Sequence, residues 1–180
     1  MLIITIPATE MFNEKTNQFF TLKEQTLQLE HSLVSLSKWE SKWGKPFLSK
    51  EEKSIAETID YIKCMTITQN VDPNVYTRLS RENIEAINNY IEAPMTATTF
   101  YGDEQKGRSK EIVTSELIYY WMIALNIPME CQRWHLNRLL TLVRVCNVKN
   151  APPKKRSRGE IMRHNAALNA SRRKQLNSRG

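Results

Sequence analysis

The spacing of apolar residues changes from every second residue to every third or fourth at about residue 31, and this change constrains the fold most. Before it, the segments LIITI (2–6) and QFFTL (18–22) are rich in β-branched and aromatic residues and flank a polar stretch, which predicts a β-hairpin. The alternating leucines of QTLQLE (25–30) are compatible with a third strand. Because an isolated hairpin is only marginally stable, we expect it to pack on the helices that follow.

Helical spacing predicts three helices in the middle of the chain, the first from about His31 to Gly44 and the others at 48–67 and 80–92. Gly44 ends the first of them. In the second, Ser49 lies three residues before Glu52, the arrangement of a capping box. Ser80 is the predicted cap of the third.

Two longer helices are predicted near the C-terminal end of this region. The polar segment 101–108 contains two glycines and predicts an exposed loop. Helices are then expected at 110–126 and 128–147, the second with Pro128 in its first turn, where proline is tolerated. Their short connection and broad apolar faces predict an antiparallel helical hairpin at the centre of the core.

Charge separates the chain into a nearly neutral part and a basic end. Residues 149–180 contain ten Lys/Arg and one Glu, a formal charge of +9, whereas the other residues carry 16 Lys/Arg and 18 Asp/Glu, or −2. Paired prolines and a run of cations at 150–159 predict a linker. We therefore expect a mainly α fold: an N-terminal β-hairpin (1–30), a helical body (31–148) and a basic C-terminal arm (149–180) that becomes ordered against a partner.

Cys131 and His135 are four residues apart, a spacing that places two side chains on one face of a helix. A structural zinc site needs four such ligands, and Cys64, Cys146, His31 and His164 provide no second close pair. A nucleophilic cysteine needs a low pKa, whereas Glu130 is the preceding residue. We therefore predict helix packing for this pair, reduced free thiols, and no metal, cofactor or catalytic site.

No other motif points to an enzyme. The five glycines form neither a GxGxxG nor a GxxxxGK sequence. Trp39 and Trp43, one helical turn apart beside Lys38 and Lys42, are predicted core residues or, alternatively, an exposed face that contacts a partner.

Neither a membrane segment nor a signal peptide is predicted. The longest apolar stretch, 117–129, contains Asn126 and Pro128 and is about half the length needed to cross a bilayer, so it predicts a buried helix. The N-terminal MLIITIP lacks the basic region and cleavage site of a signal peptide.

The basic arm has two interpretations. It could bind nucleic acid through its charge, with strong salt dependence, or it could bind an acidic or amphipathic protein. The arm contains no aromatic residue, which disfavours base stacking. As its candidate contact residues we take Arg172, Arg173 and Lys174.

Several long segments resemble a family of small proteins of tailed bacteriophages, the tail assembly chaperones. They are SLVSLSKWESKWGKPFL (32–48), IDYIKCMTITQNV (59–71), APMTATTF (93–100), ELIYYWMIALNIPMECQRWHLNRLLTLVRVCN (116–147) and the terminal RRKQLNSRG. The resemblance covers nearly the whole chain, including MLIITIP at its start.

The resemblance implies a protein without catalytic activity that acts in the host cytoplasm during tail assembly. Its partner would be the long helical tape measure protein, which it would keep soluble until tail tube subunits polymerise around it. A structural protein of the virion, in the tail or the head–tail connector, remains the alternative, because an N-terminal hairpin is suited to strand addition to a neighbour. Copies of this chain could also associate with one another.

Overall fold

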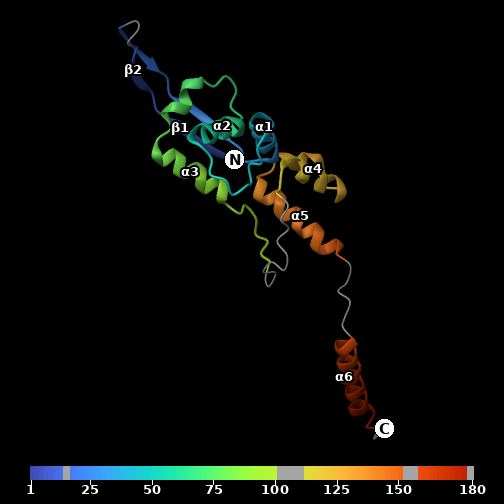
Figure 1. The fold of residues 1–180 in the computed structure, drawn as a ribbon. Helices are drawn as coiled ribbons and strands as arrows, with labels where there is room; N and C mark the ends of the chain where they lie inside the picture. The colour runs from blue at the N-terminus through green and yellow to red at the C-terminus, as the bar shows by residue number, and fades with distance from the viewer. Residues whose placement is uncertain (14–16, 101–111, 152–157, 178–180) are drawn as a thin grey trace. The chain divides into compact units, whose positions relative to one another are not determined.

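The structure is a computed structural model and describes residues 1–13, 17–100, 112–151 and 158–177. It is mainly helical, with a short antiparallel hairpin at the N-terminus, as the sequence predicts (Figure 1). The strands are β1 (Leu2–Ile6), β2 (Thr9–Asn13), β3 (Gln18–Leu22) and β4 (Gln25–Leu29). The helices are α1 (Leu33–Trp43), α2 (Ile55–Met65), α3 (Arg81–Glu92), α4 (Ser115–Ala124), α5 (Leu136–Asn150) and α6 (Arg158–Leu176), with 3-10 turns η1 (Pro73–Arg78) and η2 (Met129–Arg133).

The N-terminal strands form one long antiparallel ribbon. β1 pairs with β4, and β2 pairs with β3. The two paired residue numbers add up to 31 in both halves, from Leu2 with Leu29 to Asn13 with Gln18. The register is therefore the same in both halves, and neither side of the ribbon contains an extra residue. The predicted pairing of 2–6 with 18–22 is therefore wrong. The polar strand β2 was missed because its residues, TEMFN, lack the apolar alternation of a half-buried strand.

The two halves of the ribbon differ in their surroundings. In the half made by β1 and β4, four side chains are buried in the core: Ile4, Ile6, Leu27 and Leu29. The β2 and β3 half extends away from the helices (Figure 1). Between the halves, the guanidinium of Arg78 donates to the carbonyl oxygens of Pro7 and Lys23, one from each side of the ribbon.

Serine caps begin the helices in the middle of the chain. The Ser54 hydroxyl accepts from the Glu57 N–H while the Glu57 carboxylate accepts from the Ser54 N–H, so α2 begins with a capping box. The predicted box at Ser49 and Glu52 is wrong, because these residues lie before the helix. The prediction for α3 is confirmed, since Ser80 accepts from the Asn83 N–H.

The last two predicted helices of the body are shorter than expected. α4 begins at Ser115, capped by Thr114, whereas the predicted start at residue 110 and the loop at 101–108 lie outside the described residues. The predicted helix 128–147 is interrupted: Pro128 precedes the 3-10 turn η2, and α5 begins only at Leu136. The interruption is stabilised by the Leu136 N–H, which donates to the His31 carbonyl, and by a bridge between Ser32 and His135.

The buried side chains form two clusters rather than one. The first joins the ribbon, Trp39 of α1, α2, η1 and α3. The second joins Leu33 and Leu36 of α1 to α4, η2 and α5. The helical pair α4 and α5 therefore forms the second cluster together with α1, and not the centre of a single core as predicted.

A buried carboxylate orients α4 against α1. Glu40 of α1 accepts from the Phe47 N–H through Oε1, at 2.8 Å, and from the Ser115 N–H through Oε2, at 2.7 Å. Ser115 is in the first turn of α4, where a negative charge also interacts favourably with the helix dipole. Glu40 thus holds the chain after α1 and the start of α4 together.

The chain divides into two compact units, residues 1–147 and 148–180. The second unit contains α6, in which every side chain is exposed. Residues 152–157, most of the predicted linker, are outside the described residues.

Candidate functional site

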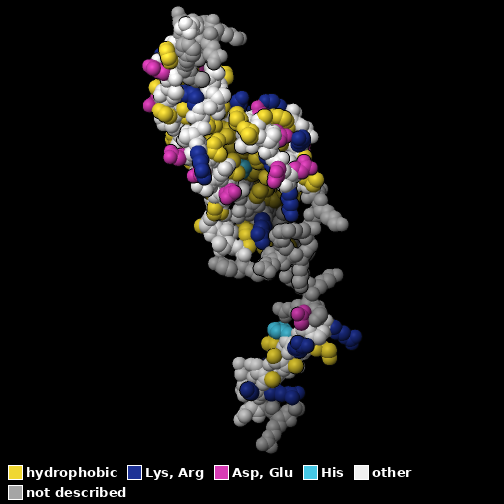
Figure 2. Space-filling model, turned by 60° about the vertical axis from the view of Figure 1, so that its left-hand side comes forward, with side chains coloured by type: hydrophobic (Ala, Val, Ile, Leu, Met, Phe, Trp, Pro, Cys, Tyr) yellow, Lys and Arg dark blue, Asp and Glu magenta, His cyan; other side chains and the backbone are white. Residues whose placement is uncertain are grey.

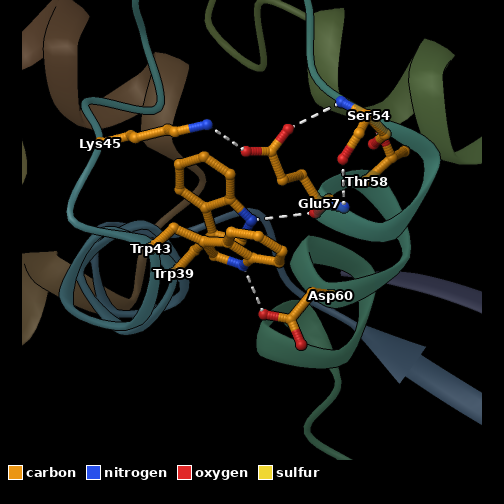
Figure 3. Close-up of polar contacts among 7 residues, drawn as sticks. All are labelled: Trp39, Trp43, Lys45, Ser54, Glu57, Thr58 and Asp60. Carbon is orange, nitrogen blue, oxygen red and sulfur yellow. Dashed lines mark hydrogen bonds and ion pairs between the residues drawn. The ribbon is translucent and has the colours of Figure 1, made fainter.

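The first candidate contact residues, Trp39 and Trp43, lie on α1 with their rings stacked 6.1 Å apart (Figure 3). Trp39 is only 1% exposed, and its indole N–H donates to the Glu57 carbonyl of α2 at 2.9 Å. Trp39 is therefore a core residue, which corrects its interpretation as part of an exposed face. Trp43 is half-buried and packs on the same cluster.

The carboxylate of Asp60 on α2 fixes the position of the Trp43 side chain. The Trp43 indole N–H donates to Asp60 Oδ2 at 2.9 Å (Figure 3). Lys42 pairs with Asp60 Oδ1. Burial raises the pKa of Asp60, but the hydrogen bonds from Lys42 and Trp43 outweigh it, so the pKa lies below its usual value. The arrangement holds α1 against α2.

Glu57 is the second carboxylate of this contact. Lys45 donates to its Oε1 at 2.9 Å and the Ser54 N–H to its Oε2 at 2.7 Å (Figure 3). The hydrogen bond from Lys45 and those from Ser54 lower the pKa of Glu57 to about 2. Glu57 is therefore ionised at neutral pH and acts as a structural partner of the cap and of Lys45.

Cys131 and His135 do not share a helix face. Cys131 is buried in η2, whereas His135 lies in the interruption before α5. His135 Nδ1 accepts from the Asn137 N–H, so Nε2 carries the proton and donates to the Tyr90 carbonyl at 2.9 Å. In the described part of the chain no three His, Cys, Asp or Glu side chains are placed to hold a metal ion. The expectation that no metal binds stays a prediction.

A buried pair of histidines was not anticipated from the sequence. The rings of His31 and His135 lie 5.0 Å apart, and His31 Nδ1 is hydrogen-bonded to the Tyr61 hydroxyl at 2.6 Å. Burial and the neighbouring His135 lower the pKa of His31 to about 4. Burial also lowers the pKa of His135. His31 is therefore neutral at pH 7, and we interpret both histidines as interior hydrogen-bonding residues.

Arg172, Arg173 and Lys174 lie in the last two turns of α6 and are exposed. Because consecutive residues are 100° apart on a helix, these three cations point in three directions around it. Figure 2 shows cationic and hydrophobic side chains next to one another on this helix. The helix therefore presents charge on several sides and no separate apolar face.

The clearest candidate for a binding surface is α4. Its core face consists of Ser115, Ile118 and Met122, which are fully buried. The opposite face is not buried as predicted: Tyr120 is 63% and Ile123 is 68% exposed. We call these two residues the outer face of α4. Their apolar character was visible in the sequence, but it did not show which side of the helix would be covered.

A second apolar surface adjoins α4 and is called here the apolar groove. It has a volume of about 670 Å³ and is lined by Leu48, Ser49, Lys50, Glu51, Ile112, Val113, Trp121 and Leu140. Apolar side chains thus come from the chain after α1, the chain before α4, α4 itself and α5. Sequence reasoning missed the groove because it joins residues that are up to 92 positions apart, from Leu48 to Leu140.

Comparison with known proteins found no matching protein-family model, no matching curated protein and no matching solved structure. Within the described ranges, no helix is both long enough and apolar enough to cross a membrane.

Proposed function

We propose that this protein is a phage tail assembly chaperone that binds the helical tape measure protein before the tail tube forms around it. The observation that carries the proposal is that α4 is apolar around its circumference while only one side of it is buried. A helix that is hydrophobic on all sides belongs in an interior. In this chain a partner would complete that interior.

The partner's chemistry is consistent with this surface. A long helix with apolar stripes aggregates unless its stripes are covered, and a helix is commonly covered by an apolar groove or helix face. The outer face of α4 and the apolar groove provide such a surface on the body. The exposed cations of α6 would add attraction to acidic residues of the partner at long range.

The test is co-expression with the tape measure protein encoded by the same phage. We expect the protein to raise the soluble yield of the tape measure protein and to co-purify with it. Ile123→Asp on the outer face of α4 should abolish this effect. Ile55→Asp is the matched control, since Ile55 is also an exposed isoleucine, 81% exposed, but lies on α2.

The arm is tested separately by replacing Arg172, Arg173 and Lys174 with Glu. We expect weaker association and a smaller salt dependence, because exposed charges are screened near physiological ionic strength. Tight binding of unrelated DNA or RNA at physiological salt, without any effect on the tape measure protein, would reject the proposal.

The second candidate function is a structural role in the virion. The observation in its favour is the β2 and β3 half of the ribbon, which extends from the helices and carries the exposed Phe19. Such a ribbon could add a strand to a neighbouring subunit. Mass spectrometry of purified particles separates the two functions: a chaperone is absent from them, whereas a structural protein is present at fixed copy number.

A further inference from the structure

The apolar groove is formed before any partner arrives. Its two loop walls are Leu48 to Glu51 on one side and Ile112 with Val113 on the other. Glu40 accepts from the N–H of Phe47 through one oxygen and from the N–H of Ser115 through the other. One buried carboxylate therefore fixes the chain next to each wall, which reduces the conformational entropy lost on binding.

The groove leaves apolar side chains in contact with solvent. Ile112 is 58% and Leu48 is 38% exposed, and Trp121 and Leu140 are only partly buried. Two sides of the apolar helix α4 are thus uncovered: the side of Trp121, which lines the groove, and the outer face. Exposed apolar surface of this kind in a folded body marks a site of association.

The charges around the groove indicate what covers it. The part of α5 in the first unit carries two arginines and no acidic residue. Arg138 is about 200° around the helix from Leu140 and lies over the Trp134 ring, so only Arg144 is relevant to the groove. Arg144 follows Leu140 of the groove by one helical turn, so the two lie on the same face of α5, and its guanidinium lies 3.9 Å from the centre of the Phe100 ring. Lys50 and Glu51 on the rim carry opposite charges, so among these described residues Arg144 makes the border along α5 positive.

The positive charge of this border disfavours two possible occupants of the apolar groove. The helix α6 carries five Lys/Arg and one Glu within Arg158–Leu176, and would bring like charge to the groove. A second copy that presented the same face of α5 would bring its own Arg144 towards this Arg144. A partner with acidic residues beside an apolar stripe has neither disadvantage.

We propose that the apolar groove binds an amphipathic helix whose apolar stripe is bordered by Asp and Glu. This inference rests on the proposed function, because it describes the segment of the tape measure protein that the body recognises. The apolar stripe enters between Leu48, Ile112 and Trp121, and the acidic border lies along α5 near Arg144.

The first experiment uses two fluorescein-labelled peptides of about 20 residues, long enough to form a helix. Both carry leucine at positions i, i+3, i+4 and i+7, and one has Glu and the other Lys beside this stripe. We expect the full-length chain to bind the Glu peptide about fivefold or more tightly than the Lys peptide, measured by fluorescence anisotropy. Equal binding, or preference for the Lys peptide, would overturn the inference.

The second experiment tests the position of the site with matched variants. Ile112→Glu should weaken binding of the Glu peptide by about 100-fold, because it places a charge in the apolar contact. Ile67→Glu should leave binding unchanged, since Ile67 is a comparable isoleucine, 53% exposed, outside the groove. Arg144→Glu should remove the preference for the Glu peptide while circular dichroism stays unchanged. Unaltered binding by Ile112→Glu would place the site elsewhere.

Two further results separate this inference from the proposed function. If Ile112→Glu still solubilises the tape measure protein while the Ile123→Asp chain does not, the function stands and the groove inference fails. If wild-type protein binds the Glu peptide but never solubilises the tape measure protein, the groove inference stands and the proposed function fails. Loss of self-association in Ile112→Glu without any peptide binding would identify a second copy as the occupant and overturn the inference.

Discussion

His31 places an ionisable ring in the interior of the body. It is buried beside His135 and hydrogen-bonded to Tyr61, and its pKa is lowered to about 4. The unfolded chain therefore takes up this proton at a higher pH than the folded chain, so protonation favours unfolding. The stabilisation is complete above the ordinary histidine pKa of 6.5 and decreases as the pH falls towards 4.

The expected loss of stability from this one group is about 3 kcal/mol between pH 6.5 and 4, at 1.36 kcal/mol for each pKa unit. In His31→Gln the free energy of unfolding should change much less over this interval, measured by urea denaturation at a series of pH values. His164→Gln, on the exposed helix α6, is the control and should keep the wild-type slope. A wild-type slope in His31→Gln would show that other groups cause it.

Residue environments of this kind could not be predicted from the sequence. The sequence predicted Cys131 and His135 as a packing pair on one helix face, whereas the structure places Cys131 in η2 and His135 before α5. The contact of His31 with Tyr61 joins residues 30 positions apart. Helical spacing likewise identified Trp39 as an apolar position but left open whether it faced the core or a partner.

At the scale of elements, the start of α2 shows how a local signal can be ambiguous. Ser49 with Glu52 and Ser54 with Glu57 both fit the capping-box pattern. The helix begins at the second pair because Glu57 also binds Lys45, and because Trp39 of α1 donates to the Glu57 carbonyl. These contacts come from the neighbouring helix and are not contained in the local sequence.

The two serines give a direct comparison. Ser54→Ala should lower the free energy of unfolding by about 1 kcal/mol, the usual contribution of an N-cap. Ser49→Ala should change it by less than about 0.5 kcal/mol, as for surface substitutions away from such features. Urea denaturation of both variants measures the difference. Equal effects would contradict the assignment of the cap to Ser54.

The strand pairing of the ribbon could be predicted only in part. β-branched and aromatic residues located β1 and β3, and alternating leucines located β4, but the partners were assigned wrongly because β2 lacks such a pattern. Both halves of the ribbon share one register. At their junction, Arg78 of η1 holds Pro7 and Lys23, a contact that comes from outside the ribbon. The hairpin was therefore predictable as a class, and its pairing was not.

At the scale of the whole molecule, the two units should differ in their contribution to stability. All described side chains of α6 are exposed, so this helix buries little apolar area. A chain ending at Pro153 should therefore melt within about 2 °C of the full-length protein, which corresponds to less than about 1 kcal/mol. Differential scanning calorimetry checks this expectation. A drop of many degrees would show that residues 154–180 belong to the folded body.

The position of α1 between the two clusters has a consequence for how the body unfolds. Trp39 belongs to the first cluster, whereas Leu33 and Leu36, on the same helix, belong to the second. Neither cluster is complete without α1, so opening either one removes support from the other. The amide hydrogens of α2 and of α5 should consequently exchange with solvent through a common opening event, and the body should behave as one cooperative unit despite its divided interior.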